Sequence, residues 1–289
     1  MSARLDQRGV LCAFAAFLAW GVSPIFFKAL SWVPAAEIVS HRVIWSVLLL
    51  LVWIGFQQGF GKLKAVFARP RTLALLGLTT VLTASNWLLY VWAILAGHTV
   101  EASLGYFINP LLNVALGALV LRERLRPLQW AAVGLAVLGV VSRIVMMGRL
   151  PWIALLLAGT FAAYGLLRKR APVDSVNGLC VETLLALPIA LIYLLWVGLG
   201  EGLAGADRGW ALLLLPAAGL VTTVPLALFT EGARRLPLST VGLLQYIAPT
   251  LQFLCAVFVF GEAFGPTQLA SFALIWAGLA LYSFDALRR

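Results

Sequence analysis

Long apolar runs separated by short polar segments dominate the chain. Breaking the sequence at charged clusters, prolines and glycines leaves ten apolar segments of about 20 residues, the length that an α-helix needs to cross a bilayer. These segments are 9–30, 35–57, 72–95, 100–121, 128–146, 150–168, 177–199, 210–232, 238–260 and 267–287. The longest connection, residues 58–71, is too short for a separate catalytic unit. The pattern therefore predicts an all-α polytopic membrane protein with ten transmembrane helices.

The composition excludes a soluble protein. Of the 289 residues, 62% are hydrophobic and only 11% are charged, whereas a soluble domain carries about 25% charged residues. Cys12, Cys180 and Cys255 all lie inside apolar segments, so a disulfide framework is not expected. The first apolar run follows Arg4 and Arg8 but exceeds the roughly 7–15 residues of a signal peptide. We interpret it as an uncleaved first helix.

The basic residues predict the orientation of the helices. Most of the 21 Lys and Arg residues fall at alternate segment ends, in groups of two to four, and such groups face the cytoplasm. The groups are Arg4 and Arg8; Lys62, Lys64, Arg69 and Arg71; Arg122, Arg124 and Arg126; Arg168, Lys169 and Arg170; Arg234 and Arg235; Arg288 and Arg289. Both termini are therefore predicted to be cytoplasmic. This spacing does not indicate nucleic-acid binding.

An internal repeat relates the two halves of the chain. Shifting the sequence by 139 positions aligns Val100–Val140 with Ser239–Leu279 without a gap, with 11 identities in 41 positions. The identities include Pro110 with Pro249, Glu123 with Glu262, Pro127 with Pro266 and Gln129 with Gln268. The repeating unit is five helices, in residues 1–147 and 148–289. An odd number of spans inverts the second copy, and inverted repeats with a site at their interface are typical of secondary transporters.

Arg42 and Glu182 are the ions predicted to lie inside the membrane. An offset of 140, close to that of the repeat, places them at equivalent positions. Charged residues in a bilayer are costly and often functional, so Arg42 could attract an anionic group and Glu182 could take up a proton or cation. Alternatively, the two form a buried ion pair that only fixes the helices, or Arg42 reaches the outer interface. His41 is a candidate proton relay, or it pairs with Glu37 one helical turn away.

Uncharged polar residues complete the predicted site. Thr79, Thr83, Asn86 and Tyr90 form one stripe of the third segment, either as contacts between helices or as a cavity wall. The fourth and ninth segments each carry a central proline, which interrupts backbone hydrogen bonds as expected near a transport site. The predicted substrate contacts are Arg42, Asn86, Tyr90, Tyr106, Asn109, Asn113, Gln245, Tyr246 and Gln252; the predicted coupling residues are Glu182 and His41. In the alternative interpretation, the amide side chains are packing contacts around helix kinks.

Six short motifs carry a family resemblance: AEI at 36–38, HRVIWS at 41–46, NWLLY at 86–90, EASLGYFINP at 101–110, LST at 238–240 and QYIAPT at 245–250. They resemble the RarD group of the EamA family, in the drug/metabolite transporter superfamily. The resemblance covers essentially the whole chain. It implies a multi-pass permease of the bacterial inner membrane with ten helices in two inverted halves. It also implies export of small metabolites such as amino acids, or of drugs such as chloramphenicol, without supplying one substrate.

The sequence thus predicts a secondary active transporter that works by alternating access. Its partners would be a small-molecule substrate and the lipid bilayer, with no nucleic acid, and the protein would be a monomer or a homodimer. No motif indicates a cofactor, a metal site or catalytic residues, so we do not expect an enzyme. Two alternatives remain. A passive pore would need polar stripes through the whole membrane, and a membrane enzyme acting on a lipid-linked substrate would need His or carboxylate clusters at one membrane face.

Overall fold

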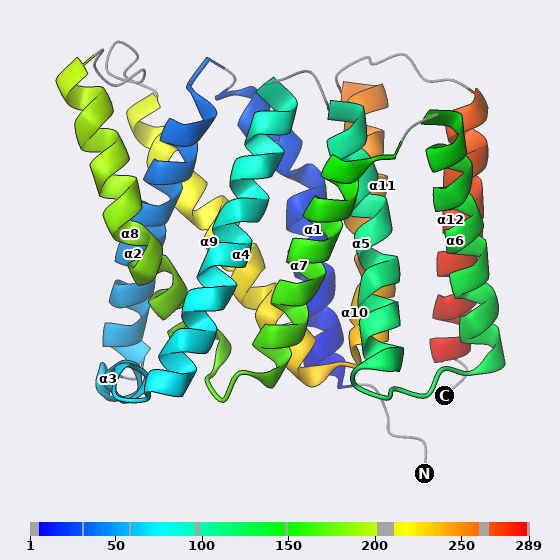
Figure 1. The fold of residues 1–289 in the computed structure, drawn as a ribbon, viewed down its shortest axis with the longest axis horizontal. Coiled ribbons are helices and arrows are strands. Elements are labelled where there is room, and N and C mark those ends of the chain that lie inside the picture. Colours follow the sequence, from blue (N-terminus) through cyan, green and yellow to red (C-terminus); the bar gives the residue numbers. More distant parts are fainter. Residues whose placement is uncertain are drawn as a thin grey trace.

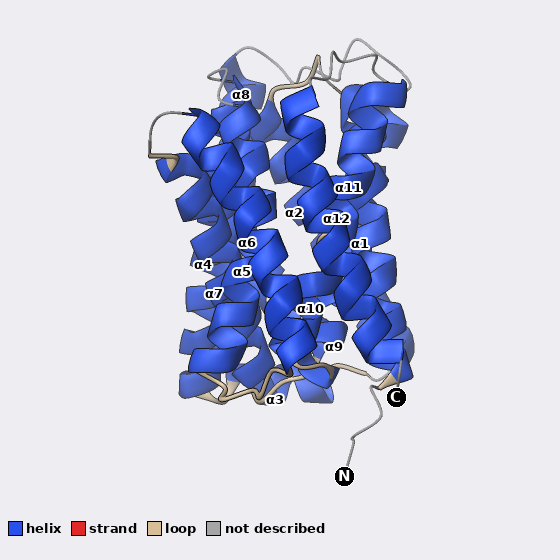
Figure 2. Cartoon of the chain, turned by 90° about the vertical axis from the view of Figure 1, so that its right-hand side faces the viewer, coloured by secondary structure: helices blue, strands red, loops and turns tan. Residues whose placement is uncertain are grey.

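The computed structural model describes residues 6–30, 32–57, 59–95, 99–147, 150–200, 211–259 and 266–287, and these residues form helices and short connections without a strand (Figure 2). The α-helices are α1 Gln7–Lys28, α2 Ala35–Gln57, α3 Gly61–Phe67, α4 Pro70–Leu95, α5 Thr99–Leu119, α6 Pro127–Met147, α7 Trp152–Arg170, α8 Ser175–Gly200, α9 Ala211–Arg235, α10 Leu238–Leu244, α11 Ile247–Leu254 and α12 Pro266–Leu287. A π-helix, η1, spans Cys255–Val259. The all-α prediction is confirmed for the described residues.

Two elements differ from the predicted helices. The connection at 58–71 contains the short helix α3, and the ninth segment is divided into α10, α11 and η1. The division falls at Gln245 and Tyr246, next to Pro249. α11 starts two residues before Pro249, so this proline lies in the first turn, where its missing N–H is tolerated; α5 instead continues through the equivalent Pro110. The Gln245 carbonyl, to which Pro249 cannot donate, accepts a hydrogen bond from the Ala248 N–H at 3.2 Å.

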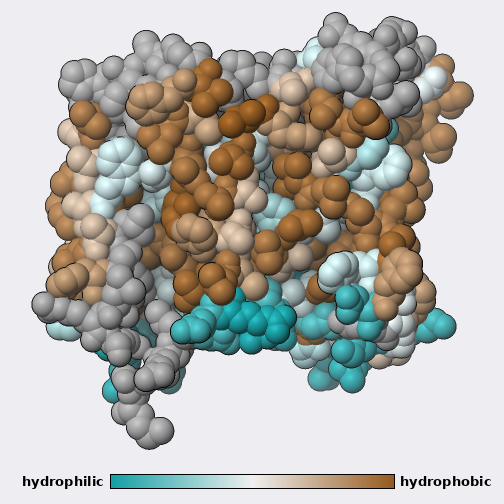
Figure 3. Space-filling model, turned by 180° about the vertical axis from the view of Figure 1, so that it is seen from behind, coloured by the Kyte–Doolittle hydropathy of each residue, from teal (hydrophilic) through white to brown (hydrophobic). Residues whose placement is uncertain are grey.

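The outer surface is suited to lipid. Among the described residues, five helical segments are long and apolar enough to cross a membrane: Gln7–Phe27, Ala35–Gln57, Pro70–Tyr90, Ser175–Leu199 and Leu213–Arg235. Gly105–Leu119 and Pro127–Ser142 are shorter apolar helices. Large apolar side chains point outward, with Phe56 and Leu199 each 89% exposed. Figure 3 shows this apolar flank with hydrophilic side chains gathered at the lower end, the distribution expected of a multi-pass membrane protein.

The helix contacts of the two halves correspond. Helix α1 of the first half packs against α9 of the second, and α7 of the second half packs against α4 of the first; likewise α2 contacts α9 and α8 contacts α4. The contact of α5 with α7 corresponds to that of α11 with α1, while α2 with α8, α5 with α10, and α6 with α12 are pairs of equivalent helices. In Figure 1, α1 begins and α12 ends at the same lower end. Exchanging the halves therefore reproduces the main helix contacts.

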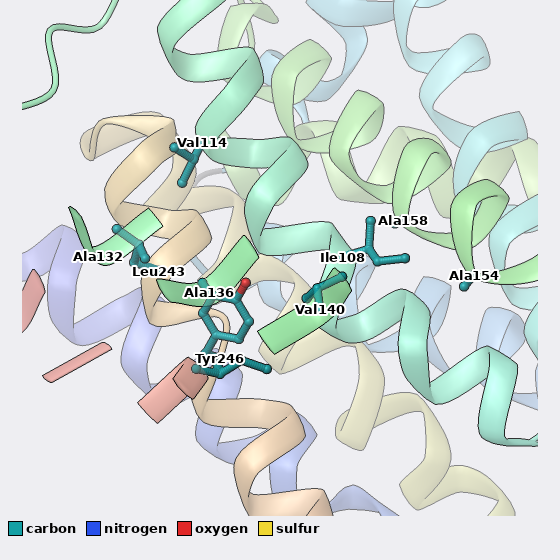
Figure 4. Close-up of a cluster of buried hydrophobic side chains, with 10 residues drawn as sticks. Ile108, Val114, Ala132, Ala136, Val140, Ala154, Ala158, Leu243 and Tyr246 are labelled. Atoms are coloured by element: carbon teal, nitrogen blue, oxygen red, sulfur yellow. The ribbon is translucent and has the colours of Figure 1, made fainter. Parts of the chain in front are cut away.

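One apolar cluster joins the halves beside the central crossing of α5 and α10. Figure 4 shows its buried side chains, which come from α5, α6, α7 and α10 and from Tyr246 in the turn after α10. The cluster consists of Ile108, Val114, Ala132, Ala136, Val140, Ala154, Ala158, Leu243, Tyr246 and Ile275. Its alanines let α6 approach its neighbours closely, as small residues do between membrane helices.

Candidate functional site: a cavity between the two halves

A cavity of about 320 Å³ lies between the halves. Its wall is made by the later part of α1, the beginning of α2, parts of α4, α5, α7, α9 and α11, and Gln245 between α10 and α11, so both halves of the chain contribute. The lining residues are Phe17, Trp20, Ser23, Pro24, Phe27, Ala35, Ile38, Val39, Arg42, Asn86, Trp87, Tyr90, Tyr106, Phe161, Thr222, Leu226, Gln245, Ala248, Pro249 and Gln252. Because it includes the end of α1 and the start of α2, the cavity lies toward the end opposite to the start of α1.

Arg42 supplies a positive charge to the cavity wall. It shares one face of α2 with the lining residues Ile38 and Val39, four and three positions earlier. Its guanidinium carbon lies 3.8 Å from the ring centroid of Trp87, in a cation–π contact. Its Nη1 atom is buried and has no hydrogen-bond partner among the described residues. The Arg42 guanidinium is therefore held in place by an aromatic face and has a free donor.

Aromatic side chains form a large part of the remaining wall. Trp87 packs edge-on against Tyr90 with centroids 6.2 Å apart, and Tyr90 against Tyr106 at 5.6 Å. In a second group, Trp20 packs edge-on against Phe161 at 5.8 Å. Such interlocked rings leave each other few rotamers. The cavity thus offers broad apolar surfaces of defined shape.

The amide side chains of the wall are held by bonds to the protein. Asn86 donates its Nδ2 hydrogens to the Leu157 carbonyl at 2.8 Å and to Thr160 Oγ1 at 2.9 Å, which ties α4 to α7. Gln252 donates to the Trp20 carbonyl at 3.2 Å. Gln245 Oε1 accepts from Asn113 Nδ2 at 2.7 Å. These bonds orient the polar groups before any ligand arrives.

Glu182 belongs to a separate buried cluster. It accepts hydrogen bonds from Thr79 Oγ1 at 2.5 Å and from the Tyr164 hydroxyl at 3.3 Å, and its Oε1 lies 3.6 Å from Arg168 Nε. Arg168 is fully buried and also donates to the Ser175 carbonyl at 3.1 Å. A Cβ atom at Gly178 would overlap its guanidinium, so glycine makes the room for it.

The family is shown by comparison with known proteins. The model of the EamA-like transporter family matches residues 7–144 and 150–284. The chain belongs to this family. A protein of Vibrio cholerae called "Uncharacterized transporter" is 50% identical over 98% of this chain and 94% of its own length. The "Protein RarD" of Escherichia coli is 46% identical over 99% and 97%.

A more distant relative and a solved structure are also similar to this chain. A Pseudomonas aeruginosa relative called "Chloramphenicol-sensitive protein RarD" is 36% identical over 99% of this chain and 96% of its own length. A solved crystal structure has a TM-score of 0.74 at 23% identity, covering 99% of this chain and 100% of the other. At that identity, the second comparison shows the fold alone. The resemblance to the RarD group of the EamA family, expected from the motifs, is confirmed.

Six of the nine predicted substrate contacts in this EamA protein line the cavity. They are Arg42, Asn86, Tyr90, Tyr106, Gln245 and Gln252. Asn113 lies directly behind the wall, fully buried and bonded to Gln245. The stripe on α4 serves both of its predicted roles, because Asn86 and Tyr90 face the cavity while Thr79 bonds Glu182.

The other predicted site residues lie elsewhere. Asn109 is 3% exposed and Tyr246 is 1% exposed, and neither is among the lining residues. The Tyr246 hydroxyl donates to the Phe107 carbonyl at 3.2 Å within the apolar cluster of Figure 4. His41 Nε2 lies 4.0 Å from Glu37 Oε1, the pairing expected from their spacing, on a face of α2 other than that of Arg42.

The expectation that Arg42 and Glu182 together line one cavity is wrong. Glu182 is not among the lining residues, and its ion-pair partner is Arg168. The sequence placed Arg168 in a cytoplasmic group with Lys169 and Arg170, so its burial was missed. Trp87 was also missed as the partner of Arg42. The one local signal for Trp87 was its position beside Asn86.

Proposed function

We propose that this EamA protein is a secondary active transporter of small molecules that works by alternating access. Its ten spans would form two inverted halves, residues 1–147 and 148–289, in a bacterial inner membrane with both termini cytoplasmic. The observation that carries the proposal is the cavity walled by both halves. The corresponding contacts of the halves and the two regions matched by the family model support the repeat. By analogy with family members we expect export of metabolites or drugs.

Contacts between the halves close the end opposite to the cavity. The Glu123 carboxylate, in the connection before α6, accepts from the N–H groups of Leu238 and Ser239 at 2.6 and 3.0 Å and from Ser239 Oγ at 2.7 Å. A carboxylate at the start of α10 caps its free donors.

A second set of contacts closes the same end. Arg235 bonds both Asp6 at 3.1 Å and Glu231 at 2.6 Å, which joins α9 to the start of α1. The Gly9 N–H and Arg235 lower the pKa of the Asp6 carboxyl, which favours its charged form. With cytoplasmic termini, this arrangement corresponds to an outward-facing state.

A pair of amides where α5 crosses α10 suggests how the closed end opens during the transport cycle. Asn113 on α5 and Gln245 after α10 are buried and bonded to each other. The repeat offset of 139 relates Asn113 to Gln252 and Gln245 to Tyr106. Tyr106 and Gln252 both line the cavity. We propose that the Tyr106–Gln252 contact forms, and the Asn113–Gln245 bond opens, when the halves rock to the inward-facing state.

Removing one amide of each pair should shift this equilibrium differently. In Asn113→Leu, loss of one hydrogen bond should raise the ratio of inward- to outward-facing molecules roughly 2- to 10-fold. Pulsed electron paramagnetic resonance would measure it, with nitroxides at Leu119, which is 80% exposed, and at exposed Pro172, in a background without native cysteines. Gln252→Leu is the matched comparison: it loses the proposed Tyr106 contact and also the present bond to the Trp20 carbonyl, so it should lower the ratio or raise it less than Asn113→Leu does. Equal shifts in both variants would contradict the proposed exchange of contacts.

Transport itself is tested with purified protein in liposomes. Chloramphenicol and amino acids are the first compounds to test as substrates. Chloramphenicol appears in the name of the Pseudomonas relative, and amino acids are substrates expected of the family. A carrier should show counterflow, in which unlabelled substrate inside drives accumulation of labelled substrate. A passive pore would give flux without accumulation, and a membrane enzyme would give chemical turnover.

We propose Glu182 as the proton-coupling group, with His41 as a second candidate. Neutralising Glu182 would remove the counter-charge of Arg168 and so link protonation to the helix contacts. In the charge-balanced double variant Arg168→Gln/Glu182→Gln, uptake should no longer respond to an imposed pH gradient. Thr79→Ala, which keeps both charges, should retain the response. If uptake by the double variant responded to the pH gradient as the wild type does, Glu182 would not be the proton-coupling group.

A further inference from the structure

Arg168 is fully buried, and Arg42 is partly buried with a buried Nη1 atom; the two arginines differ in how their charge is balanced. Arg168 has Glu182 beside it and the Ser175 carbonyl as an acceptor. Arg42 has no carboxylate within ion-pair distance among the described residues, and its buried Nη1 has no hydrogen-bond partner there. Charges buried in proteins are normally paired, because an isolated ion in an apolar environment is costly. The charge of Arg42 therefore requires an anion that enters the cavity.

The position of the Arg42 guanidinium favours a planar anion. Its face is covered by Trp87 at 3.8 Å, so its free donors lie along the edges. A guanidinium edge presents two parallel N–H groups that match the two oxygens of a carboxylate. Stacking on Trp87 fixes the plane of this edge before binding, which reduces the entropy lost.

The other lining residues limit the net charge of the ligand and favour an apolar or aromatic group in the rest of it. Arg42 is the sole Lys or Arg among the described lining residues, and no Asp or Glu is among them. A dianion would thus carry an unbalanced negative charge into an apolar cavity, and a ligand ammonium group would find no carboxylate there. The remaining wall is largely aromatic and aliphatic, including Phe17, Trp20, Phe27 and Phe161. The volume of about 320 Å³ suits a small molecule of one or two rings.

We propose that the cavity binds small monocarboxylates with an apolar or aromatic body and without a positive charge. The carboxylate lies on the free edge of Arg42, and the body packs against the aromatic side chains of the Trp20–Phe161 and Trp87–Tyr90–Tyr106 groups. This inference rests on the proposed transport function and names the substrate class of the same cavity.

The first test compares carboxylates with neutral amides of the same shape. Full-length protein in detergent micelles is titrated by calorimetry with 3-phenylpropanoate, indole-3-acetate and 4-methylpentanoate, and with the corresponding amides. At least one carboxylate should bind roughly 10- to 100-fold more tightly than its amide, because only the anion pairs with Arg42. Empty micelles correct for partitioning. Three pairs without a preference for the carboxylate would overturn the proposal.

Variants assign the preference to Arg42. Arg42→Gln should abolish the preference for the carboxylate, and Arg42→Lys should keep part of it, because it retains the charge but not the two-pronged geometry. Lys64→Gln, which removes an exposed charge on α3, is the matched control and should change nothing. If the folded Arg42→Gln variant still preferred the carboxylate as strongly as the wild type does, the preference could not be assigned to Arg42. If that variant does not fold, the comparison of the wild-type pairs decides the question.

Phenylalanine tests the part of the proposal that excludes a positive charge. It shares the ring and carboxylate of 3-phenylpropanoate and adds an ammonium group, so it should bind several-fold more weakly. Tighter binding of phenylalanine would overturn the substrate class. The proposed function is tested separately. Counterflow of a compound that is not a monocarboxylate would support the transport function and contradict the proposed substrate class. Binding of 3-phenylpropanoate without counterflow would support the ligand class and contradict the transport function.

Discussion

Replacing Glu182 with glutamine should lower the free energy of unfolding by about 3–5 kcal/mol, the range typical of breaking a buried ion pair from one side. The variant leaves Arg168 charged at a site with 0% exposure. A guanidinium keeps its proton under all ordinary conditions, so the variant cannot relieve the uncompensated charge by losing it. Two hydrogen bonds that Glu182 accepts, from Thr79 and Tyr164, also weaken when the acceptor becomes neutral.

The reverse substitution should be milder. In Arg168→Gln the remaining carboxylate can take up a proton and become neutral, so the cost should be smaller than for Glu182→Gln. The double variant Arg168→Gln/Glu182→Gln should recover most of the loss. Unfolding in mixed micelles, followed by circular dichroism, gives the three values of a double-mutant cycle. Equal losses of stability in both single variants, or no loss in either, would show that the cost does not come from leaving the Arg168 charge without a partner.

Introducing a single methyl group at Gly242 should also disturb the protein strongly. An alanine Cβ at this position would lie 2.6 Å from the Pro110 carbonyl oxygen and 2.9 Å from Asn113 Cβ. The first of these atoms belongs to the backbone and cannot rotate away, so α10 and α5 must separate. Overpacking of this kind costs about 1–3 kcal/mol. Separation should also break the Asn113–Gln245 bond that lies at the same crossing.

Gly159 in α7 is the matched control for Gly242. A Cβ atom there would meet nothing within 4 Å, and alanine is favoured over glycine inside a helix by about 0.5–1 kcal/mol. Gly159→Ala should therefore leave stability unchanged or raise it, while Gly242→Ala lowers it, in the same unfolding measurement. Two variants of equal stability would mean that the crossing is not tightly packed.

The positions of the long helices were predictable from the sequence. Each of the ten apolar segments contains a helix whose ends lie within a few residues of the expected ones, apart from the division of the ninth. This agreement has a physical origin, since a backbone inside a bilayer must satisfy its hydrogen bonds within the helix. Hydrophobicity alone then indicates where each helix runs. The short helix α3 was missed because it lies among basic residues at a helix end, where that constraint does not apply.

The site was only partly predictable, because helical periodicity shows which residues share a face but not what that face meets. Asn86 and Tyr90 were assigned to one stripe correctly, yet the same stripe carries Thr79 into contact with Glu182. Similarly, the repeat related Arg42 to Glu182 in the sequence, but repeated positions in two halves need not touch.

The sequence by itself determined the helical class and most of the polar residues around the cavity, because these follow from composition and periodicity, and its motifs determined the family. The tertiary structure alone decided the partners of the charges. It set Arg42 on Trp87 and buried Arg168 beside Glu182. Partner choice depends on how each helix is rotated and how closely it approaches its neighbours. Those quantities are set by packing between helices far apart in the chain, and no local pattern records them.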